Sequence, residues 1–178
     1  MRVYLAGFMG SGKSTVGPPA ADELDLAFMD LDDVIEARAG RSIPDIFAEG
    51  GEAAFRRMEA EALRATAEHD GVMVALGGGT VVDDANRAFA ASHGLLIYLE
   101  VSADTIVDRV ASEAAHRPLL QDAAGTPLSP DRLRVRIERM LDDRRAAYEA
   151  APVTIDAGRP VGAVAHDIVE AVQAQHAR

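Results

Sequence analysis

The sequence predicts an α/β fold in which helices cover a parallel β-sheet, and two observations support this prediction. Short apolar runs alternate along the chain with longer segments of helical period, which is the pattern of repeated βα units. A glycine-rich segment, GFMGSGKS at residues 7–14, follows the first apolar run, where such loops bind phosphate groups. With 178 residues the chain is too short for two ordinary domains, so we expect one domain over residues 1–178.

The expected elements can be placed in chain order. The strands are short runs of β-branched or apolar residues at 3–6, 27–29, 72–76, 95–99 and 153–155. The clearest helices have apolar residues every three or four positions and cover 52–68, 103–111, 130–148 and 161–175. A further helix is expected in the segment DDVIEARAG, with Asp33 as its N-cap.

Two segments interrupt this regular alternation. Pro18 and Pro19 fall in the second turn of the helix after the glycine-rich loop, and each removes a helical hydrogen bond, so we expect a kinked or shortened helix. Residues 112–129 have no clean period and contain two prolines and a glycine. We expect a long loop there, and such loops in compact domains often act as lids.

The loop at residues 7–14 matches the pattern GxxxxGK[ST] of nucleotide-binding proteins. Its glycines let backbone N–H groups face phosphate oxygens, Lys13 can reach the β and γ phosphates, and the Ser14 hydroxyl can bind Mg²⁺. Lys13 is the sole lysine among 18 basic residues, and a compact ammonium fits a phosphate nest better than a planar guanidinium. The residues expected to bind ATP here are Gly10, Ser11, Gly12, Lys13, Ser14 and Thr15.

Acidic residues follow the second predicted strand. Asp30 and Asp32 in FMDLDD are placed at the end of this strand, on one side of its pleat because strand side chains alternate. The carboxyl edge of a parallel sheet faces the ligand crevice. One carboxylate can therefore support Mg²⁺ through water, and the other can accept a proton from an attacking hydroxyl. The alternative is that Asp32 or Asp33 only caps the next helix.

A triple glycine and two arginines are candidates for substrate binding. Gly77–Gly79 follow the third strand and expose backbone that a ligand can approach closely, although a flexible turn would also use glycine. Arg56 lies beside an apolar stripe of its helix, where a surface arginine is the plainer interpretation. Arg144 falls in the centre of a stripe, which directs a permanent charge inward, either toward a ligand or into a structural ion pair.

Composition restricts the partners. The net charge of −11 opposes binding to nucleic acid and to anionic membranes. Without cysteine the chain has neither disulfides nor a thiolate nucleophile, and no apolar stretch approaches the roughly 20 residues of a membrane span. The first residues indicate a strand rather than a signal peptide. We therefore expect a cytoplasmic protein, monomeric, that binds a small molecule.

Taken together, six segments of the sequence resemble the shikimate kinase family: GFMGSGKSTVG, FMDLDDVIE, GRSIPDIFAEGGEAAFRRME, LGGG, RPLL and RRAAY. The resemblance runs over nearly the whole chain. It implies a P-loop kinase fold similar to that of the nucleoside monophosphate kinases, with a five-stranded parallel sheet and a mobile lid. It also implies that ATP, with Mg²⁺, phosphorylates the 3-hydroxyl of shikimate on the route to chorismate and the aromatic amino acids.

The resemblance also assigns roles by position. Asp32 would contact the shikimate hydroxyls and act as the base, with Asp30 supporting Mg²⁺. Arg56 and Arg144 would clamp the shikimate carboxylate, with backbone contact from Gly78 and its neighbours. Three more arginines would bind ATP, one from the lid and two beside the adenine: Arg117, Arg109 and Arg159.

Two other functions remain open from the sequence. A sugar or sugar-acid kinase of related architecture would share the phosphate-binding loop and the lid. A non-catalytic ATP-binding regulator is a second alternative, which the retention of Lys13, Ser14, Asp30 and Asp32 argues against.

Overall fold

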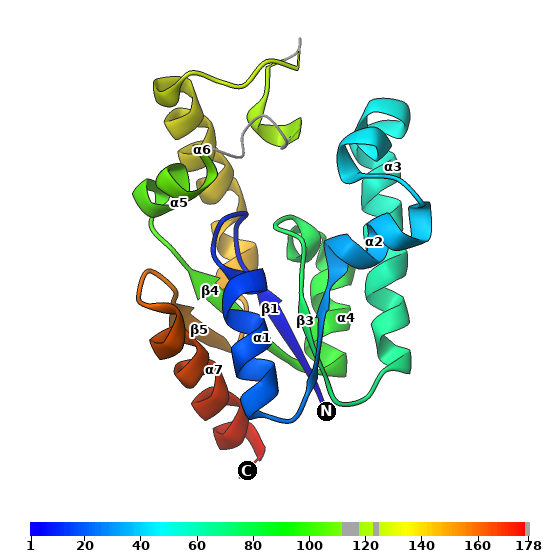
Figure 1. Cartoon of the computed structure of the whole chain (residues 1–178), viewed down its shortest axis with the longest axis vertical. Helices are drawn as coiled ribbons and strands as arrows, with labels where there is room; N and C mark the ends of the chain where they lie inside the picture. Colours follow the sequence, from blue (N-terminus) through cyan, green and yellow to red (C-terminus); the bar gives the residue numbers. More distant parts are fainter. Residues whose placement is uncertain (112–117, 123–124, 177–178) are drawn as a thin grey trace.

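In the computed structural model, which describes residues 1–111, 118–122 and 125–176, the core is a five-stranded parallel sheet (Figure 1). Its strand order is β2-β3-β1-β4-β5. The strands are β1 (Arg2–Ala6), β2 (Ala27–Asp30), β3 (Val72–Ala75), β4 (Leu95–Glu100) and β5 (Val153–Asp156). All five predicted strands are confirmed. The central strands β1, β3 and β4 are almost entirely buried, as expected where helices cover both faces.

Helices pack on both faces of the sheet. In front of it in Figure 1, α1 (Lys13–Glu23) lies beside α7 (Val161–His176). On the far side α4 (Asp84–His93) packs against β4 and against α3 (Ile43–Ala65). Short 3₁₀ turns, η1 (Thr66–Glu68) and η2 (Thr80–Val82), follow α3 and β3. None of the helices in the described residues is long and apolar enough to cross a bilayer.

Two helical regions rise above the carboxyl edge of the sheet, one on each side of the loop after β1 (Figure 1). One consists of α2 (Leu31–Ala39) and the first part of α3. The other consists of α5 (Ala103–Val110), η4 (Pro118–Leu120) and the first half of α6 (Pro130–Glu149). The ligand crevice of a parallel sheet opens at this edge, so these regions form its walls.

The helix α3 bends where it approaches the site. Gly51 has φ 68° and ψ −178°, which are non-helical, and it separates residues 43–50 from the straight segment that follows. Ser42 caps the first segment by accepting a hydrogen bond from the backbone N–H of Asp45. The predicted helix over 52–68 is confirmed as the second part of α3 and η1. The first part was not predicted from the sequence, although it forms one wall of the site.

The structure corrects the expectation for Pro18 and Pro19. The helix α1 runs on through both prolines to Glu23 and is not shortened. Both prolines lie on the exposed side of α1, where water can satisfy the carbonyls that they leave without helical donors. On the buried side Gly17 packs so closely on Phe28 that a Cβ atom would lie 2.2 Å from its ring. This contact anchors the same turn of the helix.

The acidic segment after β2 also differs from the prediction. The N-cap of α2 is Asp30, not Asp33, because the Asp30 carboxylate accepts the backbone N–H of Asp32 at 3.0 Å. Asp32 is therefore a first-turn helical residue and does not share a strand pleat with Asp30. The two carboxylates nevertheless reach the same crevice, as described below.

Candidate active site

The loop between β1 and α1 wraps around the side chain of Lys13. The Lys13 ammonium donates to the carbonyls of Gly7 at 2.9 Å and Phe8 at 3.1 Å, and the residue is 8% exposed. Gly10 and Gly12 have φ values of 77° and 96°, which residues with a side chain rarely adopt. The resulting turn directs the amino end of α1 toward the crevice, where it favours an anion.

A cavity of about 520 Å³ opens over this loop. At the edge of this cavity, the Ser14 hydroxyl donates to the carboxylate of Asp30 at 2.5 Å. Arg109, another lining residue, donates to the Gly10 and Ala157 carbonyls at 3.1 and 3.2 Å. Arg159 also lines this cavity and pairs with Asp167. The structure thus brings together all the predicted ATP-binding residues that it describes: Gly10, Ser11, Gly12, Lys13, Ser14, Thr15, Arg109 and Arg159.

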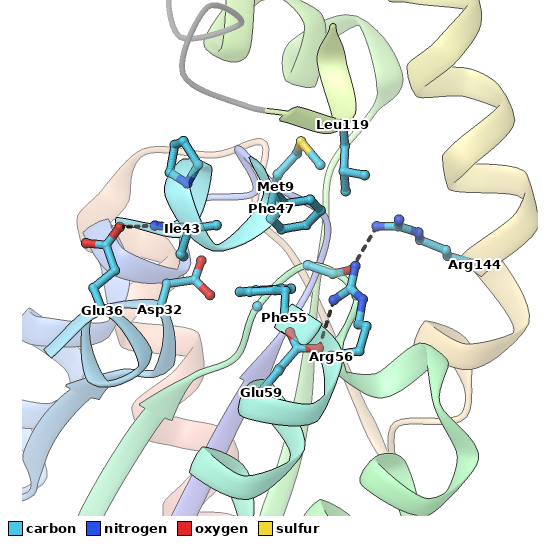
Figure 2. Close-up of a pocket in the computed structure, with 14 residues that line it drawn as sticks. Met9, Asp32, Glu36, Ile43, Phe47, Phe55, Arg56, Glu59, Leu119 and Arg144 are labelled. Atoms are coloured by element: carbon cyan, nitrogen blue, oxygen red, sulfur yellow. Dashed lines mark hydrogen bonds and ion pairs between the residues drawn. The ribbon is translucent and has the colours of Figure 1, made fainter. Parts of the chain in front are cut away.

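A second cavity of about 460 Å³ adjoins the first. Figure 2 shows two carboxylates on one side of it, two guanidinium groups on the other, where Glu59 pairs with Arg56, and apolar side chains between the two sides. The carboxylates belong to Asp32 and Glu36, and the guanidinium groups to Arg56 and Arg144. The main apolar lining residues are Met9, Ile43, Phe47, Phe55 and Leu119. Such a cavity fits a small ligand with an anionic end, a hydroxylated end and an apolar body.

Asp32 lies at the junction of the two cavities. Together with Met9 and Gly78 it lines both of them. A carboxylate at this position can face a ligand in the second cavity while a phosphate group lies in the first. This is the geometry that transfer between two bound molecules needs.

Arg56 is held by a buried acid, Glu59, which was not among the predicted site residues. Glu59 is 0% exposed; its carboxylate pairs with Arg56 at 2.8 Å and accepts the Thr80 hydroxyl at 2.6 Å. Glu52 binds the same guanidinium at 3.1 Å. Burial lowers the pKa of Arg56, but the two acids outweigh burial, and the pKa is raised. The sequence signal was the Arg56–Glu59 spacing of three residues, one helical turn.

Arg144 extends from α6 to the wall of the second cavity, and Arg56 extends to the same wall from α3. Its Nη1 donates to the carbonyl of Gly78 at 3.2 Å, and its guanidinium lies 5.5 Å from the ring centroid of Phe8. The inward stripe predicted for α6 is confirmed, because Leu133, Ile137 and Tyr148 are buried. Arg144 itself is half-buried at the cavity wall and makes no ion pair within the described part of the chain.

Other parts of the site pack closely against the triple glycine. A Cβ atom on Gly77 would lie 2.4 Å from the Glu59 carboxylate, and one on Gly79 would lie 2.6 Å from both terminal nitrogens of Arg56. At Gly78 the nearest atom would be the backbone nitrogen of Met9, at 3.0 Å. Each glycine therefore makes room for a different part of the site, which a flexible turn would not need.

Comparison with known proteins now identifies the family, since the shikimate kinase family profile matches residues 9–173. The chain belongs to the shikimate kinase family. Shikimate kinase from Salinibacter ruber is 60% identical over 175 residues, covering 98% of this chain and 86% of that protein. A shikimate kinase from Thermus thermophilus is 42% identical over 169 residues, covering 94% of this chain and 88% of that protein.

Solved structures of the shikimate kinase family share the fold. Shikimate kinase from Acinetobacter baumannii, in complex with shikimate, aligns with a TM-score of 0.87 and 30% sequence identity. The alignment covers 98% of this chain and 93% of that chain. The predicted fold of a P-loop kinase with a five-stranded parallel sheet is thereby confirmed.

The predicted lid is described only in part. Arg117 lies outside the described residues. Among the described residues after η4, the backbone N–H of Asp122 donates to the carbonyl of Thr126 at 2.9 Å, and Gln121 forms a β-bridge with Pro127. Leu120 is buried in the core while Leu119 lines the second cavity. This segment thus contributes a wall of the site.

Proposed function

We propose that this protein is a shikimate kinase, which transfers the γ-phosphoryl group of ATP to the 3-hydroxyl of shikimate and releases shikimate 3-phosphate. The reaction is that of its family and supplies the route to chorismate and the aromatic amino acids. The observation that carries the proposal is the second cavity, with guanidinium groups at one end and a carboxylate beside the phosphate-binding loop at the other. Shikimate has matching groups, a carboxylate at one end of its ring and hydroxyls at the other.

The charges of the cavity orient the substrate. Arg56 and Arg144 offer planar donors from opposite helices, which suit a carboxylate. With the shikimate carboxylate between them, the ring would lie against Met9, Phe47 and Phe55, and the hydroxyls would face Asp32. This orientation leaves the backbone of Gly77–Gly79 along one edge of the substrate.

In this proposal Asp32 receives the proton of the 3-hydroxyl as its oxygen attacks the γ-phosphorus. The bond from the γ-phosphorus to the β,γ-bridging oxygen breaks, and ADP leaves with the electron pair. Lys13 and the backbone N–H groups of the loop stabilise the negative charge of the transferring phosphoryl group. Arg109 and Arg159 would border the adenine end of the nucleotide. Arg117 would act from the lid.

The residues beside the phosphate-binding loop suit a magnesium ion. Hydroxyl and carboxylate oxygens are the protein ligands that Mg²⁺ prefers, usually with water and substrate phosphates completing its shell. Ser14 and Asp30 present this pair, 2.5 Å apart, at the rim of the first cavity. Ser14 would bind the ion directly and Asp30 through water. The bound ion would neutralise charge on the β and γ phosphates.

The test is ADP release from MgATP in the presence of different acceptors. We expect turnover with shikimate, a single phosphate monoester at its 3-hydroxyl by ³¹P NMR, and little ADP release without an acceptor. Shikimate methyl ester is the matched control, because it keeps the hydroxyls and removes the charge that the two arginines bind. Equal turnover of the ester and the acid, or a preference for gluconate, would contradict the assignment.

A further inference from the structure

We propose that Tyr148 is a positioning residue for the substrate: its hydroxyl holds the Gly78 carbonyl and so fixes Arg144 where the substrate carboxylate binds. This inference rests on the proposed function of the cavity. Tyr148 lines neither of the two cavities, so it acts through its neighbours and not by touching the substrate.

Two donors from α6 meet at one oxygen atom. Tyr148 lies one helical turn after Arg144 on α6 and is 1% exposed. Its hydroxyl donates to the carbonyl oxygen of Gly78, and Arg144 Nη1 donates to the same oxygen at 3.2 Å. A carbonyl oxygen has two lone pairs. Both are therefore used by donors from α6.

The Gly78 peptide depends on such external contacts for its orientation. It lies in a run of three glycines that have no side chains to pack, and it lines both cavities. Rotation of this peptide would move the carbonyl that Arg144 binds and would alter the backbone surface between substrate and nucleotide. The Tyr148 hydrogen bond opposes that rotation.

The ring of Tyr148 is itself fixed by the sheet. It stacks on Tyr98 of β4, with ring centroids 5.0 Å apart and an interplanar angle of 9°. Burial raises the pKa of Tyr148, although the nearby Arg144 acts in the opposite direction. The hydroxyl thus stays protonated near neutral pH and remains a donor. The two stacked rings thus connect β4 to the Gly78 carbonyl at the substrate site.

The experiment compares Tyr148→Phe with Tyr98→Phe. Tyr148→Phe keeps the ring stack and removes one hydrogen bond, so KM and Kd for shikimate should rise about 5- to 20-fold. KM for ATP should change less than twofold. Tyr98→Phe is the matched control, because the Tyr98 hydroxyl makes no hydrogen bond to another described residue and the stack is retained. Its kinetic constants should equal those of the wild type.

A double variant tests whether Tyr148 acts through Arg144. In an Arg144→Leu background, Tyr148→Phe should change kcat/KM for shikimate less than twofold further. Independent, multiplying effects would overturn the proposal, as would an unchanged shikimate Kd in the single variant. Equal losses toward ATP and shikimate with a lowered melting temperature would assign Tyr148 a purely structural role and also overturn it. Failure of the wild type to phosphorylate shikimate would instead refute the proposed function.

Discussion

Replacing Arg144 with leucine separates the binding of substrate from the stability of the fold. In the folded protein Arg144 donates one hydrogen bond to Gly78 and packs over Phe8. Leucine would keep much of the packing, and Tyr148 would still donate to the Gly78 carbonyl, so no buried acceptor would be left unsatisfied. We expect the free energy of unfolding to change by less than about 1 kcal/mol, which corresponds to at most about 4 °C in Tm.

The effect on the substrate should be much larger. Removing one partner of a desolvated, hydrogen-bonded charge pair costs about 2 to 5 kcal/mol. At about 1.4 kcal/mol for each factor of ten, kcat/KM for shikimate should fall roughly 30- to several thousand-fold. The Kd for ATP should change little, because Arg144 does not line the nucleotide cavity. Arg144→Lys should recover only part of the loss, since an ammonium lacks the planar fork.

The assay is coupled ADP release over a range of shikimate concentrations, together with thermal unfolding and ATP binding by calorimetry. Arg145→Leu is the matched control, because Arg145 is the exposed neighbour of Arg144 and pairs with Asp142 at 2.7 Å. A marked drop in Tm with kcat/KM preserved would refute the reasoning. Arg144 would then be a structural residue, and Arg56 alone would bind the carboxylate.

Three other substitutions probe the remaining groups of the site. Lys13→Met should abolish turnover and leave the fold intact, because in the proposed reaction its charge stabilises the transferring phosphoryl group. Near-normal activity in a folded variant would contradict the assignment of Lys13 to phosphate binding. Asp32→Asn should lower kcat on the order of 10²- to 10⁴-fold with ATP affinity retained. The control Asp33→Asn, at an exposed residue, should leave kcat unchanged. A loss of only a few-fold for Asp32→Asn would assign Asp32 a positioning role. Gly79→Ala should lower kcat/KM for shikimate roughly 10- to 100-fold, because the new Cβ would displace Arg56; an unchanged value in a folded variant would argue against that displacement.

Local sequence signals were sufficient for the scaffold. Each strand is a short apolar run, and the phosphate-binding loop has its glycines at fixed positions, so neither depends on distant residues. The prediction of Asp33 as the N-cap of α2 was wrong because the N-cap is the last residue with an extended backbone before the helix begins. That residue is Asp30, with φ −93° and ψ 125°.

Tertiary contacts decided what the sequence could not show. Glu59 is one of 29 acidic residues, and its spacing from Arg56 could indicate an ion pair but not burial. In the structure Glu59 is fully buried, where its carboxylate binds the Thr80 hydroxyl and the Arg56 guanidinium. No helix was predicted for the segment before Gly51, which contains Pro44 and ends in two adjacent glycines. In the structure the proline lies in the first turn of α3, where it is tolerated.

The single lysine makes the phosphate-binding loop chemically addressable. Amine-directed reagents have two kinds of target in this sequence, the α-amino group and the ε-amino group of Lys13. Reductive methylation with ¹³C-formaldehyde would therefore place an NMR label at the centre of the loop, and its signal could not overlap with that of another lysine. Lys13 is 8% exposed and its ammonium is hydrogen-bonded to two carbonyls, so labelling should be slow and should slow further with ATP bound. One resonance would then report nucleotide occupancy directly, without any engineered residue.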